Sequence, residues 1–245
     1  MMTLKNTGNR PALVAMVATT VALASMVLAA SWPGWPSRPL WFWVIACTMS
    51  ELLWVRLPRG QATLSMSSCF NIAALLILPR GQAMVAVAVS VALVESAFMR
   101  KPPVRVLFNS AQTALAVAAG SLAFSMLGGA GRSLSELVAG LDLLPFVAAG
   151  LAYSAVNTGA VSVAVALSEG LSPWKAWREN FGNGFEFLAR GALLSLGILV
   201  AVHHSLTGPL GTMLVALPLI LARQGYVRRI EGLAAQTPQQ PARAA

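Results

Sequence analysis

Residues 108–120 read FNSAQTALAVAAG, which places two side-chain amides at the head of an apolar run. Asn109 and Gln112 are three residues apart, so they lie on one face of any helix that they share. Thr113 is the last polar residue before the run becomes apolar. Because polar side chains are costly in hydrocarbon, a polar pair in such a segment has a structural or functional reason. The stretch predicts a membrane-spanning helix with a polar end.

The composition of the whole chain supports a membrane protein. Hydrophobic residues make up 57% of the 245 residues and charged residues only 10%, whereas soluble domains carry about 25% charged residues. The mean hydropathy is +0.70. The net charge of +9 does not indicate nucleic-acid binding, because no basic helix or aromatic platform accompanies it. The partner that the composition predicts is the lipid bilayer.

Apolar segments recur along the chain at a length suited to a membrane. A helix needs about 20 apolar residues to cross the hydrocarbon core. The fold class expected is therefore all-α, a polytopic transmembrane helix bundle of about eight spans. The expected spans are residues 11–31, 39–56, 63–79, 82–98, 106–128, 144–167, 184–204 and 206–222.

The basic residues predict the orientation of these spans. With the N-terminus inside, thirteen of the 17 Lys and Arg residues fall in inner segments, three fall in outer loops, and Arg190 falls within a span. An excess of Lys and Arg marks cytoplasmic loops. We therefore expect both termini to be cytoplasmic and the protein to be a multi-pass protein of the inner (plasma) membrane.

The ends of the chain and two short segments complete the organisation. Residues 1–10 are expected as a cytoplasmic N-terminus, 11–222 as the transmembrane bundle, and 223–245 as a basic cytoplasmic tail that is disordered at its end. The first apolar run is longer than that of a usual signal peptide, so we expect it to be retained as a helix. The segment 172–182, SPWKAWRENFG, predicts an amphipathic helix on the inner surface. Ser133 and Glu136 have the spacing of a capping box, which predicts a short outer helix within 131–140.

Polar residues within the spans are the candidate site. Glu186 and Arg190 are four residues apart and can pair along one helix face, either as a structural ion pair or as part of a ligand site. Asn109 and Gln112 can join helices by amide hydrogen bonds or line a polar pocket. Glu95 lies beside the basic sequence MRK, and we expect its side chain to reach the interface. The predicted ligand-binding or coupling residues are Asn71, Asn109, Gln112, Asn157, Glu186 and Arg190.

No pattern in the sequence predicts catalysis. FEFLAR contains the spacing ExxxR, but Phe185 stands where membrane proteases of the CAAX type have a second Glu. No buried histidine, Walker loop or Cys/His cluster is evident. We expect no enzyme activity, no catalytic residues, no cofactor and no metal site.

Two stretches resemble a known family of membrane regions. One runs from RLPRGQ to FNSAQTALA (56–116), and the other is SAVNTGAVSVAVALSEGLSPWKAWRENFG (154–182). They are similar to the MASE-like sensor regions that precede HD-GYP or GGDEF domains. The resemblance implies a ligand-sensing bundle whose output domain follows the last span in the cytoplasm. This chain ends after LARQGYVRRIEGLAAQ and a short tail, so we expect either that the output lies in a separate partner or that the module works alone.

Two functions compete at this point. The first is a membrane sensor or small-molecule-binding module that couples to a cytoplasmic signalling protein. The second is a small-molecule transporter or the substrate-binding subunit of one, with an ATPase as partner. A transporter is expected to bind its substrate near mid-membrane, whereas most of the polar candidates lie toward one face. A homodimer stays open in either case.

Overall fold

A computed structural model describes residues 10–32, 34, 38–53, 55–56, 63–64, 66–182 and 184–236, and side chains as far as residue 215 and at 218, except those of Arg38, Val55, Arg56, Thr63, Leu64, Phe185 and Glu186. Almost all of the described chain is helical, as the composition predicts. The helices are α1 (Arg10–Ser31), α2 (Arg38–Leu52), α3 (Ser67–Ile77), α4 (Arg80–Leu93), α5 (Pro103–Phe124), α6 (Leu134–Ala139), α7 (Leu144–Glu169), α8 (Pro173–Phe181) and α9 (Gly184–Gln236). Two π-helical turns, η1 (Val94–Phe98) and η2 (Ser125–Gly129), extend α4 and α5.

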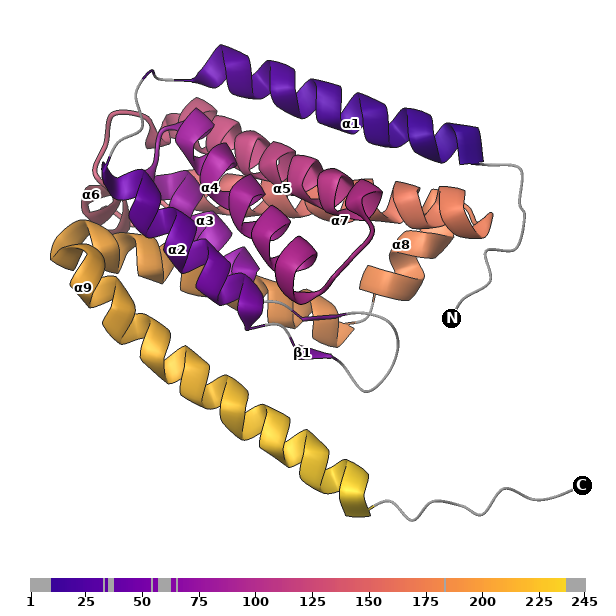
Figure 1. The fold of residues 1–245 in the computed structure, drawn as a ribbon. Coiled ribbons are helices and arrows are strands. Elements are labelled where there is room, and N and C mark those ends of the chain that lie inside the picture. The colour runs from indigo at the N-terminus through magenta and orange to yellow at the C-terminus, as the bar shows by residue number, and fades with distance from the viewer. Residues whose placement is uncertain are drawn as a thin grey trace, which may run out of the picture.

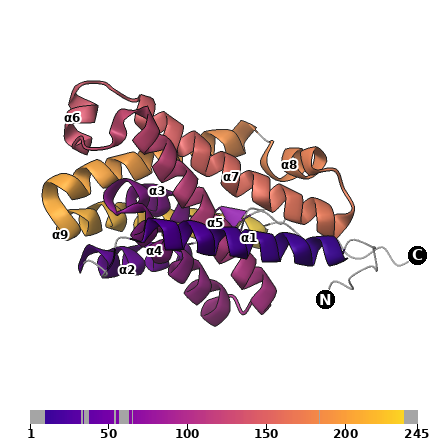
Figure 2. The same cartoon turned by 90° about the horizontal axis from the view of Figure 1, so that it is seen from above.

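The long helices pack side by side into a bundle with α5 near its centre. Helix α5 packs on α7 and α4, α2 packs on α4, and α3 packs on α9. Helix α1 lies along the outside of α4 and α5 (Figure 1, Figure 2). Only Val17 and Ala24 of α1 are buried, so this helix contributes little to the core.

The bundle has two ends that differ in construction. Helix α8, η1 and the last turn of α2 lie at one end, together with the first turns of α5 and α9, and we call this the cavity end. Helix α6, η2 and a turn within α9 lie at the opposite end, which we call the closed end (Figure 1, Figure 2). Helix α1 begins and α9 finishes on the side of α8 (Figure 1).

Helix α9 consists of two arms that run in opposite directions. The chain leaves the helical conformation at Gly208, where φ is 70° and ψ is −163°. A positive φ is open to glycine at no steric cost, and Pro209 disfavours a helical residue before it. The Gly208–Pro209 sequence therefore explains why the helix is interrupted at this point. Figure 1 shows that the second arm folds back. The predicted separation of spans 184–204 and 206–222 is correct to within a few residues.

Five described helical segments are long and apolar enough to cross a membrane. They are Arg10–Ser31, Arg80–Phe98, Pro103–Gly129, Leu144–Glu169 and Phe187–Val215, the last of which includes the Gly208 turn. Pro39–Leu52 and Ser67–Ile77 are shorter apolar helices. The count of eight spans and the cytoplasmic placement of the termini stay predictions.

The predicted spans 39–56 and 63–79 are too long. Helix α2 ends at Leu52, and Val55–Arg56 then pairs in antiparallel fashion with Thr63–Leu64 as strands β1 and β2. Helix α3 keeps 11 residues, about 16 Å at 1.5 Å per residue, and cannot cross the hydrocarbon alone. Hydropathy misses this boundary because one pair of the bridge, Val55 with Leu64, is as apolar as the residues of a helix end.

The tail boundary also differs from the prediction. Helix α9 continues through residue 222 to Gln236 without a break at that point. Residues 237–245, the predicted disordered end, lie outside the described residues, as do residues 1–9.

The two short segments form helices as predicted. In α6, Ser133 Oγ accepts a hydrogen bond from Glu136 N–H, and the Glu136 carboxylate accepts one from Ser133 N–H. This is the reciprocal capping box that the spacing predicted. In α8, Ser172 Oγ accepts from Lys175 N–H and Pro173 occupies the first turn, a position that suits proline.

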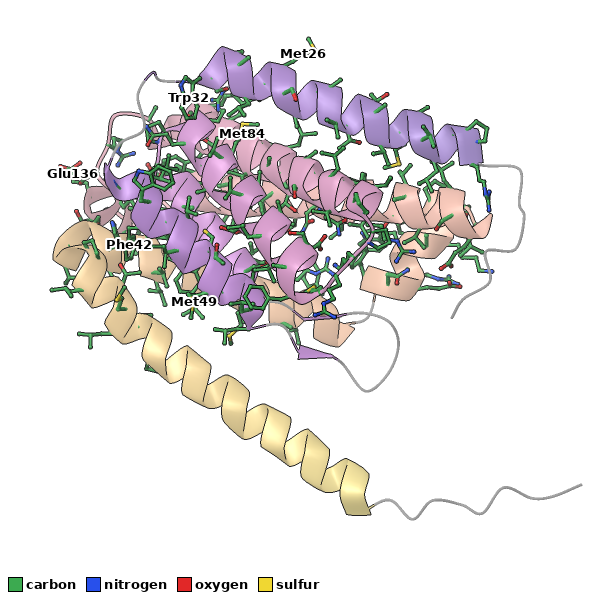
Figure 3. The ribbon with its side chains drawn as sticks, in the orientation of Figure 1. Met26, Trp32, Phe42, Met49, Met84 and Glu136 are labelled. Carbon is green, nitrogen blue, oxygen red and sulfur yellow. The ribbon has the colours of Figure 1, made fainter. Side chains whose placement is uncertain are left out.

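Close helix packing at the centre depends on small residues. A Cβ at Gly197 of α9 would lie 2.6 Å from the carbonyl oxygen of Cys69 in α3. No larger residue fits there without separating the two helices. Met84 of α4 is buried in the same core, whereas Met26 of α1 points away from the bundle (Figure 3).

Candidate functional site: a polar cavity at one end of the bundle

A cavity of about 400 Å³ opens at the cavity end of the bundle. Its walls come from α2, α3, α4, α5, α7, α8 and α9 together with η1, so no single segment builds it. Figure 3 shows nitrogen and oxygen atoms gathered at this end of the bundle. The polar lining residues are Glu51, Ser67, Ser68, Asn71, Glu95, Lys101, Asn109, Gln112, Thr113, Tyr153, Ser154, Asn157, Thr158, Asn180 and Arg190.

Five of the six predicted site residues line this one cavity. Asn71 comes from α3, Asn109 and Gln112 from α5, Asn157 from α7 and Arg190 from α9. The sixth, Glu186, belongs to the first turn of α9, but its side chain lies outside the described residues. The predicted ion pair between Glu186 and Arg190 is therefore untested.

Glu95 is the centre of a charged network in the wall. Its carboxylate accepts hydrogen bonds from Lys101 Nζ and, at 2.8 Å for both oxygens, from Asn109 Nδ2. The side chain is buried, with Glu95 only 4% exposed. The expectation that Glu95 reaches the interface is wrong. It lies in the π-turn η1, where an extra residue per turn changes the direction of the side chains relative to an α-helix.

A second chain of hydrogen bonds follows along α5. Thr113 Oγ1 donates to the Asn109 carbonyl oxygen at 2.7 Å and accepts from Gln112 Nε2 at 2.8 Å. Gln112 Oε1 is buried and has no hydrogen-bond partner within the described part of the chain. Asn109 thus joins α5 to η1 through its hydrogen bonds to Glu95. Gln112 Oε1, by contrast, is an acceptor in the cavity wall that receives no hydrogen bond from the described residues.

The wall made by α3 and α7 is held by a buried pair. Asn71 Nδ2 donates to the Tyr153 hydroxyl at 3.1 Å. Asn157 lies one turn farther along α7 and is half-buried. The Asn71 side chain therefore lines the cavity itself, and its hydrogen bond also positions the Tyr153 side chain in the cavity wall.

The remaining wall comes from α8 and the start of α9. The Arg190 guanidinium lies over the Phe181 ring, 4.4 Å from its centroid, which is the geometry of a cation–π contact. Trp177 Nε1 donates to Thr158 Oγ1 at 3.3 Å and ties α8 to α7. The predicted amphipathic helix is thus part of the cavity wall and not only a surface feature.

Sequence reasoning missed two important residues of this site. Glu51 lies inside the predicted span 39–56, and a carboxylate within a span is itself a signal of function. It lines the cavity near Glu95 and Lys101. Tyr153 carries no comparable signal, because tyrosine is common in membrane helices.

The described residues hold no cluster of three or more His, Cys, Asp or Glu side chains that could bind a metal ion. The cavity instead offers charged groups, amides and hydroxyls. Such a lining can bind and orient a polar molecule through hydrogen bonds and ion pairs.

Comparison with known proteins places the chain in a family. A family model described as MASE9 matches residues 14–226. No curated protein and no solved structure matches the chain. Because the match covers nearly all of the bundle and the cavity within it, the chain belongs to the MASE9 family, one of the MASE families of membrane-associated sensor domains.

Proposed function

We propose that this membrane sensor domain binds a small polar molecule in its cavity and transmits the occupancy of the cavity by binding alone, without catalysis. One observation carries the proposal: charged and amide side chains from helices far apart in sequence surround one space of about 400 Å³. Ligand pockets typically occupy about 300–1,000 Å³ and combine apolar walls with a few placed polar groups.

The cavity wall suggests how binding would change the protein. Asn180 and Phe181 of α8 and Arg190 of α9 face the same space as Asn109 of α5. A ligand that contacts both sides favours the arrangement in which α8 and α9 lie close to α5 and α7. Since the second arm of α9 extends to Gln236, its position would report the occupancy to a cytoplasmic partner.

The charge pattern supports placing the cavity end on the cytoplasmic side of the inner membrane. Arg100 and Lys101 lie between η1 and α5 at that end, and Arg105 lies in the first turn of α5. Lys175 and Arg178 belong to α8. Basic residues in short loops mark the cytoplasmic side. In this orientation the site would be reached from the cytoplasm or from the inner leaflet.

Affinity purification from native membranes tests the coupling. The wild-type protein is compared with Asn157→Phe, which fills the cavity from α7, and with Val163→Phe, a matched control at an exposed position of the same helix. A cytoplasmic signalling protein should copurify with wild type and Val163→Phe. Its recovery should change at least several-fold with Asn157→Phe, because the filled cavity fixes one arrangement.

Other outcomes overturn the proposal. Equal recovery of the partner from all three proteins would separate the cavity from signalling. Recovery of an ATPase pair would identify a transport subunit, and the absence of any partner would remove the coupling step.

A labelling experiment tests the orientation. Native Cys47 and Cys69 are buried, so they should react slowly with a membrane-impermeant maleimide. Ser135→Cys in α6 should be labelled in intact spheroplasts, and Lys175→Cys in α8 only after permeabilisation. The reverse pattern would place the cavity on the outer side.

A further inference from the structure

The wall of the cavity fixes the orientation of the Gln112 amide. Thr113 Oγ1 donates its proton to the Asn109 carbonyl oxygen at 2.7 Å, so toward Gln112 it can act only as an acceptor. Gln112 Nε2 donates to that oxygen at 2.8 Å. The amide nitrogen therefore faces Thr113, because the reversed amide would set two acceptors against each other. The amide oxygen is the atom left without a donor among the described residues.

This oxygen belongs to a buried side chain of the cavity lining. Gln112 is 5% exposed and lines the cavity from α5. A buried acceptor without a donor destabilises the protein, because it has lost its hydrogen bonds to water. A ligand that brings an N–H or O–H group to Gln112 Oε1 removes this penalty. The site therefore favours a ligand with a hydrogen-bond donor over one without.

Asn157 offers a second polar group to the same ligand. It lines the cavity from α7 and is half-buried, and its amide makes no hydrogen bond within the described part of the chain. An amide side chain has two N–H donors and one carbonyl acceptor. A primary amide of a ligand can pair with it through one N–H and the carbonyl oxygen. The second N–H of the ligand is then available for Gln112.

The charges of the cavity wall balance one another. The charged lining among the described residues consists of two carboxylates and two cations, Glu51, Glu95, Lys101 and Arg190. Glu95 accepts a hydrogen bond from Lys101. Glu51 is hydrogen-bonded to Ser67, and Arg190 already has interaction partners in the protein. A charged ligand would therefore enter the wall without a free counter-charge, which is costly away from water. The cavity favours an uncharged ligand.

The rest of the lining sets the size and polarity of the ligand body. Its apolar members are Val91, Val161, Val165, Phe181, Leu193 and Leu194. At about 30 Å³ for each water-sized group, the cavity of about 400 Å³ holds a molecule of roughly a dozen non-hydrogen atoms. These side chains favour an apolar body attached to the polar group of the ligand.

We propose that the cavity binds an uncharged primary amide with an apolar body, and that the amide group lies between Gln112 and Asn157. One N–H of the ligand donates to Gln112 Oε1, while the other N–H and the carbonyl oxygen pair with the Asn157 amide. This inference rests on the proposed function, since it names the ligand class of the same site.

Five probes with one common phenylalkyl body isolate the features of the ligand. The full-length protein in phosphatidylcholine nanodiscs is titrated by calorimetry with 3-phenylpropionamide, methyl 3-phenylpropionate, 3-phenylpropan-1-ol, 3-phenylpropionate and 3-phenylpropylamine, with empty nanodiscs as the blank. The amide should bind about tenfold more tightly than the ester, which lacks a donor, and than either charged probe. It should bind about threefold or more tightly than the alcohol, which cannot pair with both halves of Asn157.

Variants test the two ends of the contact. Gln112→Leu should abolish the preference for the amide over the ester, and Asn157→Leu should abolish its preference over the alcohol. Gln112→Glu places a carboxylate at the same point and should raise the affinity for 3-phenylpropylamine about tenfold, a gain that an unfolded protein cannot show. Leu107→Ala, at an exposed position of α5, is the control and should bind like wild type. A merely structural role of Gln112 and Asn157 would weaken all five probes alike.

The outcomes separate the ligand class from the function. Equal or tighter binding of the ester would overturn the donor at Gln112, and that of the alcohol would overturn the amide. Equal or tighter binding of a charged probe would overturn the uncharged ligand. In each case the cavity still binds, so the proposed sensor is kept. Absence of binding by all five probes would also overturn the amide. If Asn157→Phe in addition left partner recovery unchanged, the proposed function would fail as well.

Discussion

Both ends of the bundle contain polar side chains, but the two ends differ in packing. At the closed end, His204 Nδ1 lies 2.7 Å from Thr212 Oγ1, and its ring lies 5.4 Å from Phe42 and 5.0 Å from Trp43. Two aromatic rings thus pack against the imidazole. At the cavity end, Glu95, Asn109 and Gln112 border an open space of about 400 Å³.

The difference lies in what fills the space between the helices. Thr212 and Trp43 are fully buried at the closed end, where α9 turns at Gly208. At the cavity end, side chains from α8 and α9 face those of α5 and α7 across the cavity. A polar residue in a membrane helix therefore marks a ligand site only where tertiary packing leaves room beside it.

The largest effect on stability is expected at the closed end. Trp43→Ala should lower the free energy of unfolding by about 3–5 kcal/mol, because a large buried ring leaves a void. Trp41→Ala, two residues away on α2 and 62% exposed, is the matched control and should change it little. Equilibrium unfolding in mixed micelles measures both. Equal losses would show that the closed end is not the more tightly packed region.

The second-largest effect on stability is expected in the charged network at the cavity end. Glu95→Ala should cost about 1–3 kcal/mol, because Asn109 and Lys101 lose their acceptor. Lys101 is 34% exposed in its side chain and regains water, which limits the loss. A double-mutant cycle with Lys101→Met measures the coupling between the two groups. Glu169→Ala, at an exposed position of α7, is the control. A coupling near zero would contradict the network.

Replacement of two amides one turn apart should have different effects on stability. Asn109→Ala removes both bonds to the Glu95 carboxylate and should lower stability by about 1–2 kcal/mol. Gln112→Leu removes an unsatisfied oxygen and also the hydrogen bond from Gln112 Nε2 to Thr113 Oγ1. The two effects offset each other, so stability should change little while ligand binding weakens. Thermal unfolding and calorimetry of the same two variants check both statements. Equal destabilisation by the two would assign Gln112 a structural role.

The smallest effect is expected in the cap of α6 at the closed end. Hydrogen bonds from the backbone and side chain of Ser133 lower the pKa of Glu136 below its ordinary 4.5. A lowered pKa in the folded state means that the cap contributes stability above the unfolded value, and that this contribution is lost as the pH falls through the folded value. An NMR titration of Glu136 should show a midpoint below 4.5. Ser133→Ala should raise that midpoint, and an unchanged midpoint would contradict the cap.

Local features of the fold could be predicted because their causes are local. Ser133 and Glu136 predicted α6, and the segment 172–182 predicted α8, since caps and amphipathic spacing act over a few residues. The break expected near residue 205 lies close to the observed one at Gly208, which Pro209 follows. The ends of α2 and α3 could not be predicted, because pairing between Val55–Arg56 and Thr63–Leu64 is decided by partners along the chain and not by hydropathy.

The candidate site was predicted in its residues and only partly in its geometry. Asn71, Asn109, Gln112, Asn157 and Arg190 were found because a polar group in hydrocarbon needs a reason. The direction of Glu95 was mispredicted, since the π-turn η1 that changes its direction has no clear sequence signature. Whether these residues bind a ligand stays a prediction.

The sequence by itself determined a helical membrane protein, the residues that are costly to bury, and the turns set by Gly, Pro and Ser. These properties depend on single side chains and their near neighbours. Only the tertiary structure decided that Glu51, Glu95 and Arg190 share one cavity, while His204 packs against Phe42 and Trp43. That outcome depends on how helices distant in sequence pack. Small residues such as Gly197 fix the spacing of the helices, and the larger side chains then either fill the space between the helices or leave it open.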